Sequence, residues 1–201
     1  MMNEWGCFMN KKDNQRARLT RMLLKQAYMK LLKEKKANKV TVRDICERAE
    51  VNRSTFYLHY AEPNDLLIEI EDEAIALAKE ALSLIGAIHR PSPSVSEYLL
   101  TFVQYIRKNE ELFRTLLIEN NDPHFRWKLQ DVALEMTESN FQVALDHDYK
   151  RIIYQFIISG SLEVLTEWIK RDFALSEHSI CEILYRLSEG ALRSVTAAQA
   201  P

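Results

Sequence analysis

Residues 41–60 read TVRDICERAEVNRSTFYLHY, and this stretch decides the fold of the amino-terminal part of the chain. Thr41 is followed three residues later by Asp44, which predicts a capping box at a helix start. Asn52 is a suitable N-cap for a second helix with Phe56 on its apolar side. Two short helices joined by so tight a turn have the geometry of a helix-turn-helix, whose second helix enters the major groove of DNA.

The second helix also has a side rich in hydrogen-bond donors. These donors are Arg53, Ser54, Thr55, Tyr57, His59 and Tyr60. Arginine can reach base edges or phosphate, short hydroxyl side chains can contact DNA near a helix N-terminus, and the aromatic donors have phosphate reach. On this stretch alone, a helical hairpin with an exposed polar face is an equal alternative.

The charge distribution favours the DNA-binding interpretation. Residues 10–61 hold 14 Lys and Arg against 5 Asp and Glu, whereas residues 62–201 hold 13 against 23. The formal net charge of −2 therefore hides a basic block joined to an acidic one. Phosphate neutralisation by such a block gives non-specific DNA affinity and its dependence on salt. A basic face that is merely solvated is the alternative.

The segment from Arg16 to Leu67 resembles the DNA-binding domain of TetR/AcrR-type transcriptional regulators. The matching positions are Thr41, Val42, Ile45, Ala49, Val51, Arg53, Thr55, Phe56, Tyr57, His59, Tyr60 and Leu66. The resemblance implies that Phe56 belongs to the core. It also implies DNA contacts by Thr41, Arg43, Arg53, Ser54, Thr55, Tyr57 and His59.

Two positions depart from the family pattern. Glu50 stands where the family usually has glycine in the turn, so the backbone there either avoids a positive φ or bears local strain. Pro63 stands where the family usually has a lysine that meets phosphate. Proline suits the first turn of a helix, so we expect the helix to persist without that contact, for which Asn64 is a weak substitute.

An amphipathic helix is predicted before residue 41. Its apolar stripe comprises Leu19, Met22, Leu23, Ala27, Leu31 and Leu32. This stripe is expected to cover the helix-turn-helix. The same helix also carries many basic residues. For those at its end, from Lys33 to Lys39, interaction with the helix dipole and solvation is the preferred explanation, and DNA contact is the alternative.

Composition predicts an all-α protein. At 201 residues with 47% hydrophobic content and only 4 Gly and 5 Pro, the chain can bury a large core and is poor in turns. We expect a disordered tail over residues 1–10, a three-helix DNA-binding domain over 11–62 and a helical ligand-binding and dimerisation domain over 63–201. The three scattered cysteines, the absence of a leader and the lack of a ~20-residue apolar run favour a cytoplasmic protein without a membrane segment.

The carboxy-terminal part is predicted to consist of amphipathic helices. A helix after Pro63 is expected to end at Gly86 and the Pro91–Pro93 stretch. Two later helices, over 150–171 and around 180–192, are apolar on more than one face and need two packing partners. Burial within one monomer is one explanation. The resemblance favours a homodimer through these last two helices, in the region of Gly160 and Trp168.

What this domain senses is less defined by sequence. Candidates to line an apolar pocket are Phe102, Tyr105, Phe113, Trp127, Phe141, Tyr154 and Phe156. Aromatics at helical spacing usually belong to a core, so no ligand-binding residue is assigned. No cofactor motif, metal-ligand spacing or catalytic constellation is present, which argues against an enzyme. The carboxy-terminal half resembles the variant of the family common in Firmicutes, which includes members that act with a partner protein.

Three hypotheses follow. The first is a cytoplasmic homodimeric repressor that is released from a palindromic operator by a small-molecule effector. The second is a partner-dependent regulator of the same family without a small-molecule ligand. The third is a helical enzyme or interaction module with an incidental basic face. Sequence-selective, salt-dependent DNA binding separates the first two from the third, and effector-induced release separates the first from the second.

Overall fold

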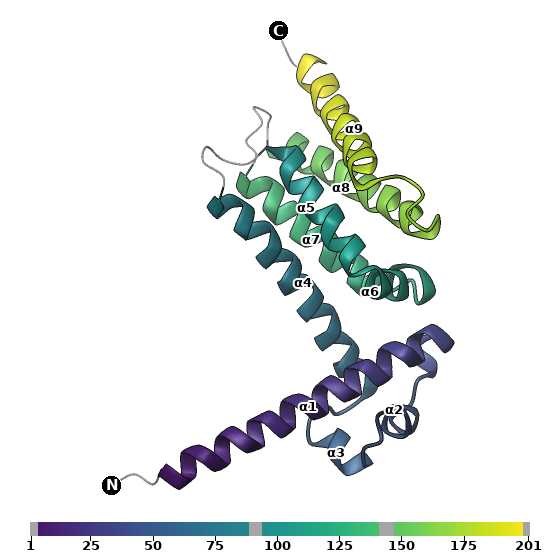
Figure 1. The fold of residues 1–201 in the computed structure, drawn as a ribbon. Helices are drawn as coiled ribbons and strands as arrows, with labels where there is room; N and C mark the ends of the chain where they lie inside the picture. The colour runs from purple at the N-terminus through teal and green to yellow at the C-terminus, as the bar shows by residue number, and fades with distance from the viewer. Residues whose placement is uncertain (1–3, 89–93, 141–146, 199–201) are drawn as a thin grey trace. The chain divides into compact units, whose positions relative to one another are not determined.

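The computed structural model describes residues 4–88, 94–140 and 147–198, which contain helices and turns and no strand (Figure 1). In chain order the α-helices are α1 (Glu4–Glu34), α2 (Val42–Ala49), α3 (Arg53–Tyr57), α4 (Pro63–Ile88), α5 (Val95–Lys108), α6 (Glu110–Arg114), α7 (Pro123–Asn140), α8 (His147–Lys170) and α9 (Glu177–Ala198). A 3₁₀ turn, η1 (Ala37–Lys39), precedes α2, and a π-helical turn, η2 (Thr115–Glu119), follows α6. The all-α prediction is confirmed.

The chain divides into two compact units, residues 1–72 and residues 73–201. The division falls inside α4, ten residues after the domain boundary expected from sequence. Helix α4 begins at Pro63, as expected for proline in a first turn, and the carboxylate of Asp65 accepts hydrogen bonds from the backbone N–H groups of Ala61 (2.9 Å) and Glu62 (3.1 Å). This carboxylate caps the start of the helix.

Two helix boundaries differ from those expected from sequence, the start of α1 and the end of α4. Helix α1 begins at Glu4, so most of the stretch expected as a disordered tail is helical; no proline interrupts it, and helix extension is cooperative. Gly86 lies within α4, which continues to Ile88 instead of ending at the glycine. Pro91 and Pro93 lie outside the described residues.

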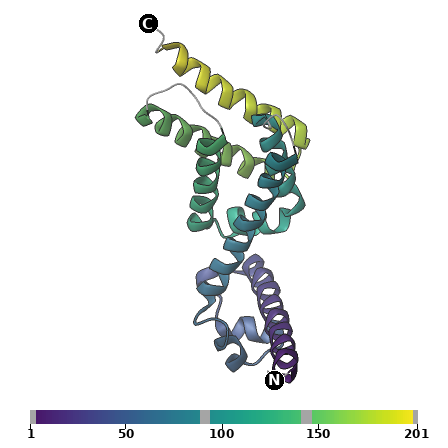
Figure 2. The ribbon, with the colours of Figure 1, turned by 90° about the vertical axis from the view of Figure 1, so that its left-hand side faces the viewer.

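Unit 1 has its core where α1 meets α2 and α3 (Figures 1 and 2). The buried side chains of α1 follow helical spacing: Leu24, Ala27, Tyr28, Leu31 and Leu32. The predicted stripe was wrong in its first half, because Leu19, Met22 and Leu23 are exposed. Apolar residues one position apart define two stripes only 100° apart on a helix, and packing selected the one through Leu24.

Unit 2 is a helical assembly in which α8 contacts α7 and α9, and α9 also contacts α5. Its core includes the fully buried rings of Phe113 and Phe125, whose centroids are 5.8 Å apart. The hydroxyl of Tyr105 donates a 2.8 Å hydrogen bond to the carbonyl of Ala74 and so joins α5 to α4. These contacts position the helices that surround the cavity described below.

Two features of helix α8 bear on the expectations from sequence. Its segment Tyr149–Lys170 is long and apolar enough to cross a membrane by length and composition, whereas no such stretch was expected. Core helices of soluble proteins meet the same criterion. Trp168, placed by sequence in the dimer region, is buried inside unit 2, where its indole N–H donates to the carbonyl of Leu175 (2.8 Å). It therefore packs within its own chain.

Candidate nucleic-acid interface and apolar cavity

The capping box at the start of α2 is confirmed. The hydroxyl of Thr41 accepts a hydrogen bond from the backbone N–H of Asp44 (3.2 Å), and the Asp44 carboxylate accepts one from the backbone N–H of Thr41 (2.8 Å). Lys35, in the segment after α1, places its ammonium 2.6 Å from the same carboxylate. Hydrogen bonds from Lys35 and then Thr41 lower the pKa of Asp44 to about 2. The start of α2 is thus fixed against the end of α1.

This lowered pKa predicts an acid-dependent contribution of Asp44 to stability. The folded pKa of about 2 lies below the unfolded value of about 3.9, so the ionised carboxylate stabilises the fold above pH ~4 and this stabilisation is lost as pH falls towards 2. Urea unfolding should therefore show that Asp44→Asn is less stable than wild type at pH 7, with the difference shrinking below pH 4. Glu47→Gln, which removes an exposed pair with Arg43, is the matched control and should change little. A pH-independent difference would contradict the assignment.

The turn between α2 and α3 carries backbone strain at Glu50. This residue has φ 56° and ψ 40°, the left-handed conformation that glycine adopts without cost. The backbone N–H groups of Glu50 and Val51 both donate to the carbonyl of Cys46, which closes α2. The sequence raised both possibilities for this position, and the structure has the strained one.

Glu50→Gly is expected to raise the free energy of unfolding by about 1 kcal/mol, because it removes the steric cost of a left-handed non-glycine residue. Equilibrium urea denaturation measures this change. Glu50→Gln keeps the strain and removes the charge, so it separates the two effects and should leave stability nearly unchanged. Equal stabilisation by both variants would assign the gain to charge instead.

One side of α3 and the turn after it faces the core of unit 1. Phe56 is 0% exposed, as predicted, and its ring centroid lies 5.6 Å from those of Tyr57 and Tyr60. Tyr60 lies beyond the end of the helix and is buried, so the expectation that it reaches phosphate was wrong. Asn52 occupies the N-cap position, but its side chain makes no capping hydrogen bond.

The other side presents most of the predicted DNA contacts to solvent. Arg53, Ser54 and Tyr57 are exposed, and Thr55 and His59 are half-buried. At the start of α2, Thr41 and Arg43 are exposed as well. The hydroxyl of Thr41 is used in the capping box, and the Arg43 guanidinium pairs with Glu47 at 2.6 Å. All seven residues thus lie between the N-cap of α2 and the turn after α3.

Several basic side chains of unit 1 make structural ion pairs. Lys25 lies 2.7 Å and Arg21 3.8 Å from the carboxylate of Glu69 on α4. Arg48 binds Glu34 through two hydrogen bonds of 2.9 Å, which ties the end of α2 to the end of α1. These pairs join α1 to α4 and α2 to α1. Part of the positive charge counted in the sequence therefore stabilises the fold.

Leu58 is an exposed residue that the sequence argument did not single out. Its side chain is 80% exposed directly after α3, beside Tyr57. The thymine methyl group is an apolar feature of the major groove, so an aliphatic side chain here suits base contact. The signal in the sequence was a leucine two residues after the core residue Phe56, a spacing that on a helix turns a side chain away from the face that Phe56 occupies.

Comparison with known proteins agrees with this geometry. Residues 24–70 match the model of bacterial regulatory proteins of the TetR family, and residues 94–190 match that of a transcriptional regulator C-terminal region named TetR_C_8. The chain belongs to the TetR family of transcriptional regulators. Its helix-turn-helix, α2 with α3, is the DNA-binding element of that family.

Individual relatives are distant. An uncharacterised HTH-type transcriptional regulator of Haemophilus influenzae is 25% identical over 108 residues, so this TetR-family chain spans about half (53%) of that curated relative. A TetR regulator from Streptococcus agalactiae is similar in structure, with a TM-score of 0.64 and 23% identity over 89% of this chain and 98% of that one. NalD of Pseudomonas aeruginosa, the secondary repressor of the MexAB-OprM efflux pump, gives a TM-score of 0.64 and 17% identity over 87% and 97%.

A third structural relative was solved with a bound molecule. FadR of Bacillus subtilis, in complex with stearoyl-CoA, gives a TM-score of 0.58 and 18% identity over 83% of this chain and 96% of that one. At these identities, the structural similarities show only the fold of this TetR-family protein and not its ligand or its target.

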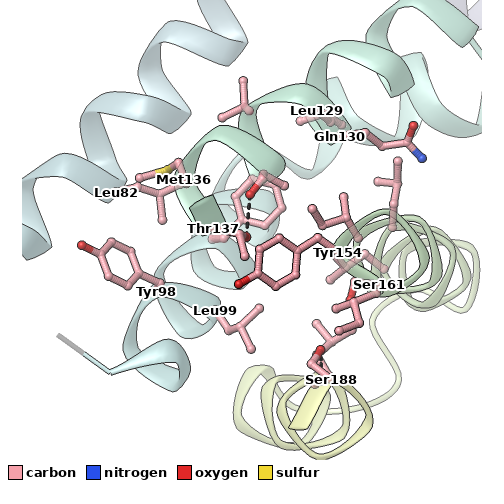
Figure 3. A pocket seen from close by; sticks show the side chains of 18 of the residues that line it. Leu82, Tyr98, Leu99, Leu129, Gln130, Met136, Thr137, Tyr154, Ser161 and Ser188 are labelled. Carbon is pink, nitrogen blue, oxygen red and sulfur yellow. Dashed lines mark hydrogen bonds between the residues drawn. The ribbon is translucent and has the colours of Figure 1, made fainter. Parts of the chain in front are cut away.

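Unit 2 contains an apolar cavity of about 200 Å³, surrounded by residues of α4, α5, α7, α8 and α9 (Figure 3). Of the aromatic residues considered from sequence, Phe102 and Tyr154 line it. Phe113 is fully buried in the core, whereas Trp127 and Phe156 are 59% and 72% exposed. Phe141 lies outside the described residues. Among the residues whose placement is described, no group of three or more His, Cys, Asp or Glu could hold a metal ion.

Proposed function

We propose that this TetR-family protein is a homodimeric repressor that occupies a palindromic operator and is released by an effector bound in unit 2. The observation that carries the proposal is the two-sided α3: Phe56 anchors one side in the core while Arg53, Ser54 and Tyr57 stand exposed on the other. A helix with this division can enter a major groove without losing its packing.

The proposed contacts differ in role. Arg53, at the first position of α3, suits bidentate recognition of guanine, with Ser54 and Thr55 near the same helix start. Tyr57 and His59 suit phosphate. Arg43 can exchange its exposed pair with Glu47 for a phosphate at little cost, because such surface pairs contribute weakly. The hydroxyl of Thr41 is used in the capping box. Thr41 is therefore proposed to act by fixing the amino end of α2, whose N–H groups can face a phosphate of the DNA.

The proposed dimer face lies on α8 and α9. Both helices present exposed residues at spacings of three or four, namely Tyr149, Ile152, Phe156 and Gly160 on α8 and Ile183, Leu187 and Gly190 on α9. Nothing lies within 4 Å of a Cβ added to either glycine, so both have open space beside them in one chain. A second copy of the chain would cover this apolar face and explains why α8 is so apolar.

The arginines provide the test of DNA recognition. Arg53→Ala should reduce the preference for operator over scrambled duplex by about 5- to 100-fold, because a base contact is lost. Arg43→Ala should instead weaken binding to both duplexes equally. It should also reduce the slope of log affinity against log salt concentration by about one. Fluorescence anisotropy at two or more salt concentrations measures both quantities, on an operator recovered by selecting bound genomic fragments with the purified protein.

Results opposite to this pattern would reassign the roles. An unchanged preference ratio for Arg53→Ala would place Arg53 on phosphate. If the wild-type protein showed no preference for any recovered fragment over bulk DNA at low salt, operator binding itself would be refuted.

A partner-dependent regulator is the second candidate. A structure described as the dihydroxyacetone kinase operon activator DhaS has a TM-score of 0.56 with this chain at 18% identity, which makes activation worth testing beside repression. The cavity in unit 2 favours the effector-released repressor. Release of the operator by a small molecule alone would distinguish the two, as would the direction of change in reporter transcription.

A further inference from the structure

The lining of the cavity in unit 2 carries no charged side chain among the residues that the structure describes. Most of it is aliphatic, contributed for example by Leu82, Leu99 and Leu129. The polar lining residues are Tyr98, Gln130, Thr137, Tyr154, Ser161 and Ser188. An ionised group placed here would lose its hydration without gaining an opposite charge, which is strongly unfavourable.

Two of the lining hydroxyls can accept hydrogen bonds but have already used their hydrogens. Thr137 donates to the carbonyl of Ala133, and Ser188 donates to the carbonyl of Leu184, each at 2.7 Å. The oxygen atoms keep lone pairs that can accept from a ligand. Figure 3 shows the ring of Tyr154 reaching from α8 towards Thr137. The cavity thus offers acceptors at its wall within an otherwise apolar surface.

The volume of the cavity gives a scale for the hydrocarbon that it can enclose. An apolar cavity of about 150 Å³ in another protein holds one benzene molecule. By this scale, the cavity of about 200 Å³ suits roughly eight to ten non-hydrogen atoms.

We propose that the cavity binds a compact, uncharged, largely hydrocarbon molecule with a single hydrogen-bond donor, such as a short alcohol or phenol. The inference rests on the proposed function in that it assigns this chemistry to the effector. Hydrocarbon packs against the leucines, and the donor meets the hydroxyl oxygen of Thr137 or Ser188.

Three probes of equal chain length and different charge test the proposal. Octanol, octanoate and octylammonium are titrated at pH 7 into the full-length protein, with binding followed by calorimetry and by the shift of the melting temperature. Octanol should bind at least about tenfold more tightly than either ion, because only the ions lose hydration without compensation. Equal or tighter binding of an ion, or no octanol binding up to its solubility limit, would overturn the proposal.

Matched variants locate the site. Ser161→Leu fills part of the cavity and should weaken octanol binding at least about tenfold, since the added carbons occupy ligand space. Ser139→Leu makes the same change at an exposed position of α7 outside the lining and should leave binding unchanged. Thr137→Val and Ser188→Ala each remove one of the two acceptors, and the variant that removes the acceptor in use should weaken octanol binding by about three- to tenfold. Unchanged octanol binding in both variants would contradict the role of these hydroxyls. Octanol binding that Ser161→Leu leaves intact would place the ligand elsewhere.

Operator release is measured separately, by adding octanol to the protein–operator complex. Cavity binding without release would support the ligand class and refute the effector role in the proposed function. If the ligand-free protein did not bind the operator, the DNA-binding assignment would be refuted, and the result on the cavity would still hold.

Discussion

Replacing Phe156 by glutamate is expected to make the protein monomeric and to lower its operator affinity by about 10²- to 10⁴-fold. Phe156 is 72% exposed near the middle of the apolar face of α8, so in a dimer it would be covered by the second copy. A buried, unpaired carboxylate there would oppose association. Since one dimer engages two half-sites, a monomer loses the effective concentration that links the two contacts. Sedimentation measures the mass, and fluorescence anisotropy measures the affinity.

Trp127→Glu is the matched control for this experiment. Trp127 is 59% exposed on α7, which is not one of the two helices of the proposed dimer face, so this variant should remain dimeric. Gly160→Ala refines the test, because the added Cβ has nothing within 4 Å in one chain and should weaken only the dimer. If Phe156→Glu were dimeric at micromolar concentration, the proposed face on α8 and α9 would be wrong.

Phe56→Ala should unfold the DNA-binding unit while unit 2 stays folded. The ring is 0% exposed and packs against Tyr57 and Tyr60, so its removal should cost about 3 to 5 kcal/mol, a large part of the stability of a small domain. Thermal unfolding followed by circular dichroism should then show loss of part of the helical signal at low temperature and a later transition from unit 2. The division of the chain into two compact units is the basis for expecting two steps.

Leu58→Ala provides the control two residues along the chain. Leu58 is 80% exposed, so its truncation should change the free energy of unfolding by less than about 0.5 kcal/mol. A single cooperative loss of all helical signal in Phe56→Ala would show that the two units unfold together and would contradict independent folding.

The features that sequence predicted well are local ones. The Thr41–Asp44 capping box, the helix start at Pro63 and the buried Phe56 depend on residues within a few positions of each other. The strain at Glu50 was recognised as a possibility because only the turn geometry was needed to define it.

The features that sequence missed depend on packing between distant segments. Two adjacent apolar stripes on α1 have the same periodicity. Leu24 is buried and Leu23 is exposed because of the way α1 packs against its neighbours in unit 1. Trp168 can be buried because its indole N–H donates a hydrogen bond to the carbonyl of Leu175, which lies beyond the end of α8. The cavity exists because side chains from five helices leave space between them, and no periodic pattern encodes an unfilled volume.

The uncharged lining of the cavity has a consequence for how the protein would respond to its surroundings. Counterion release makes DNA binding weaken steeply as ionic strength rises, whereas contact between a neutral molecule and a hydrocarbon wall is almost insensitive to it. A rise in ionic strength would therefore weaken the proposed DNA binding at constant effector occupancy. In the proposed regulator, occupancy of the operator would thus depend on two separate quantities, the ionic strength and the concentration of the neutral effector.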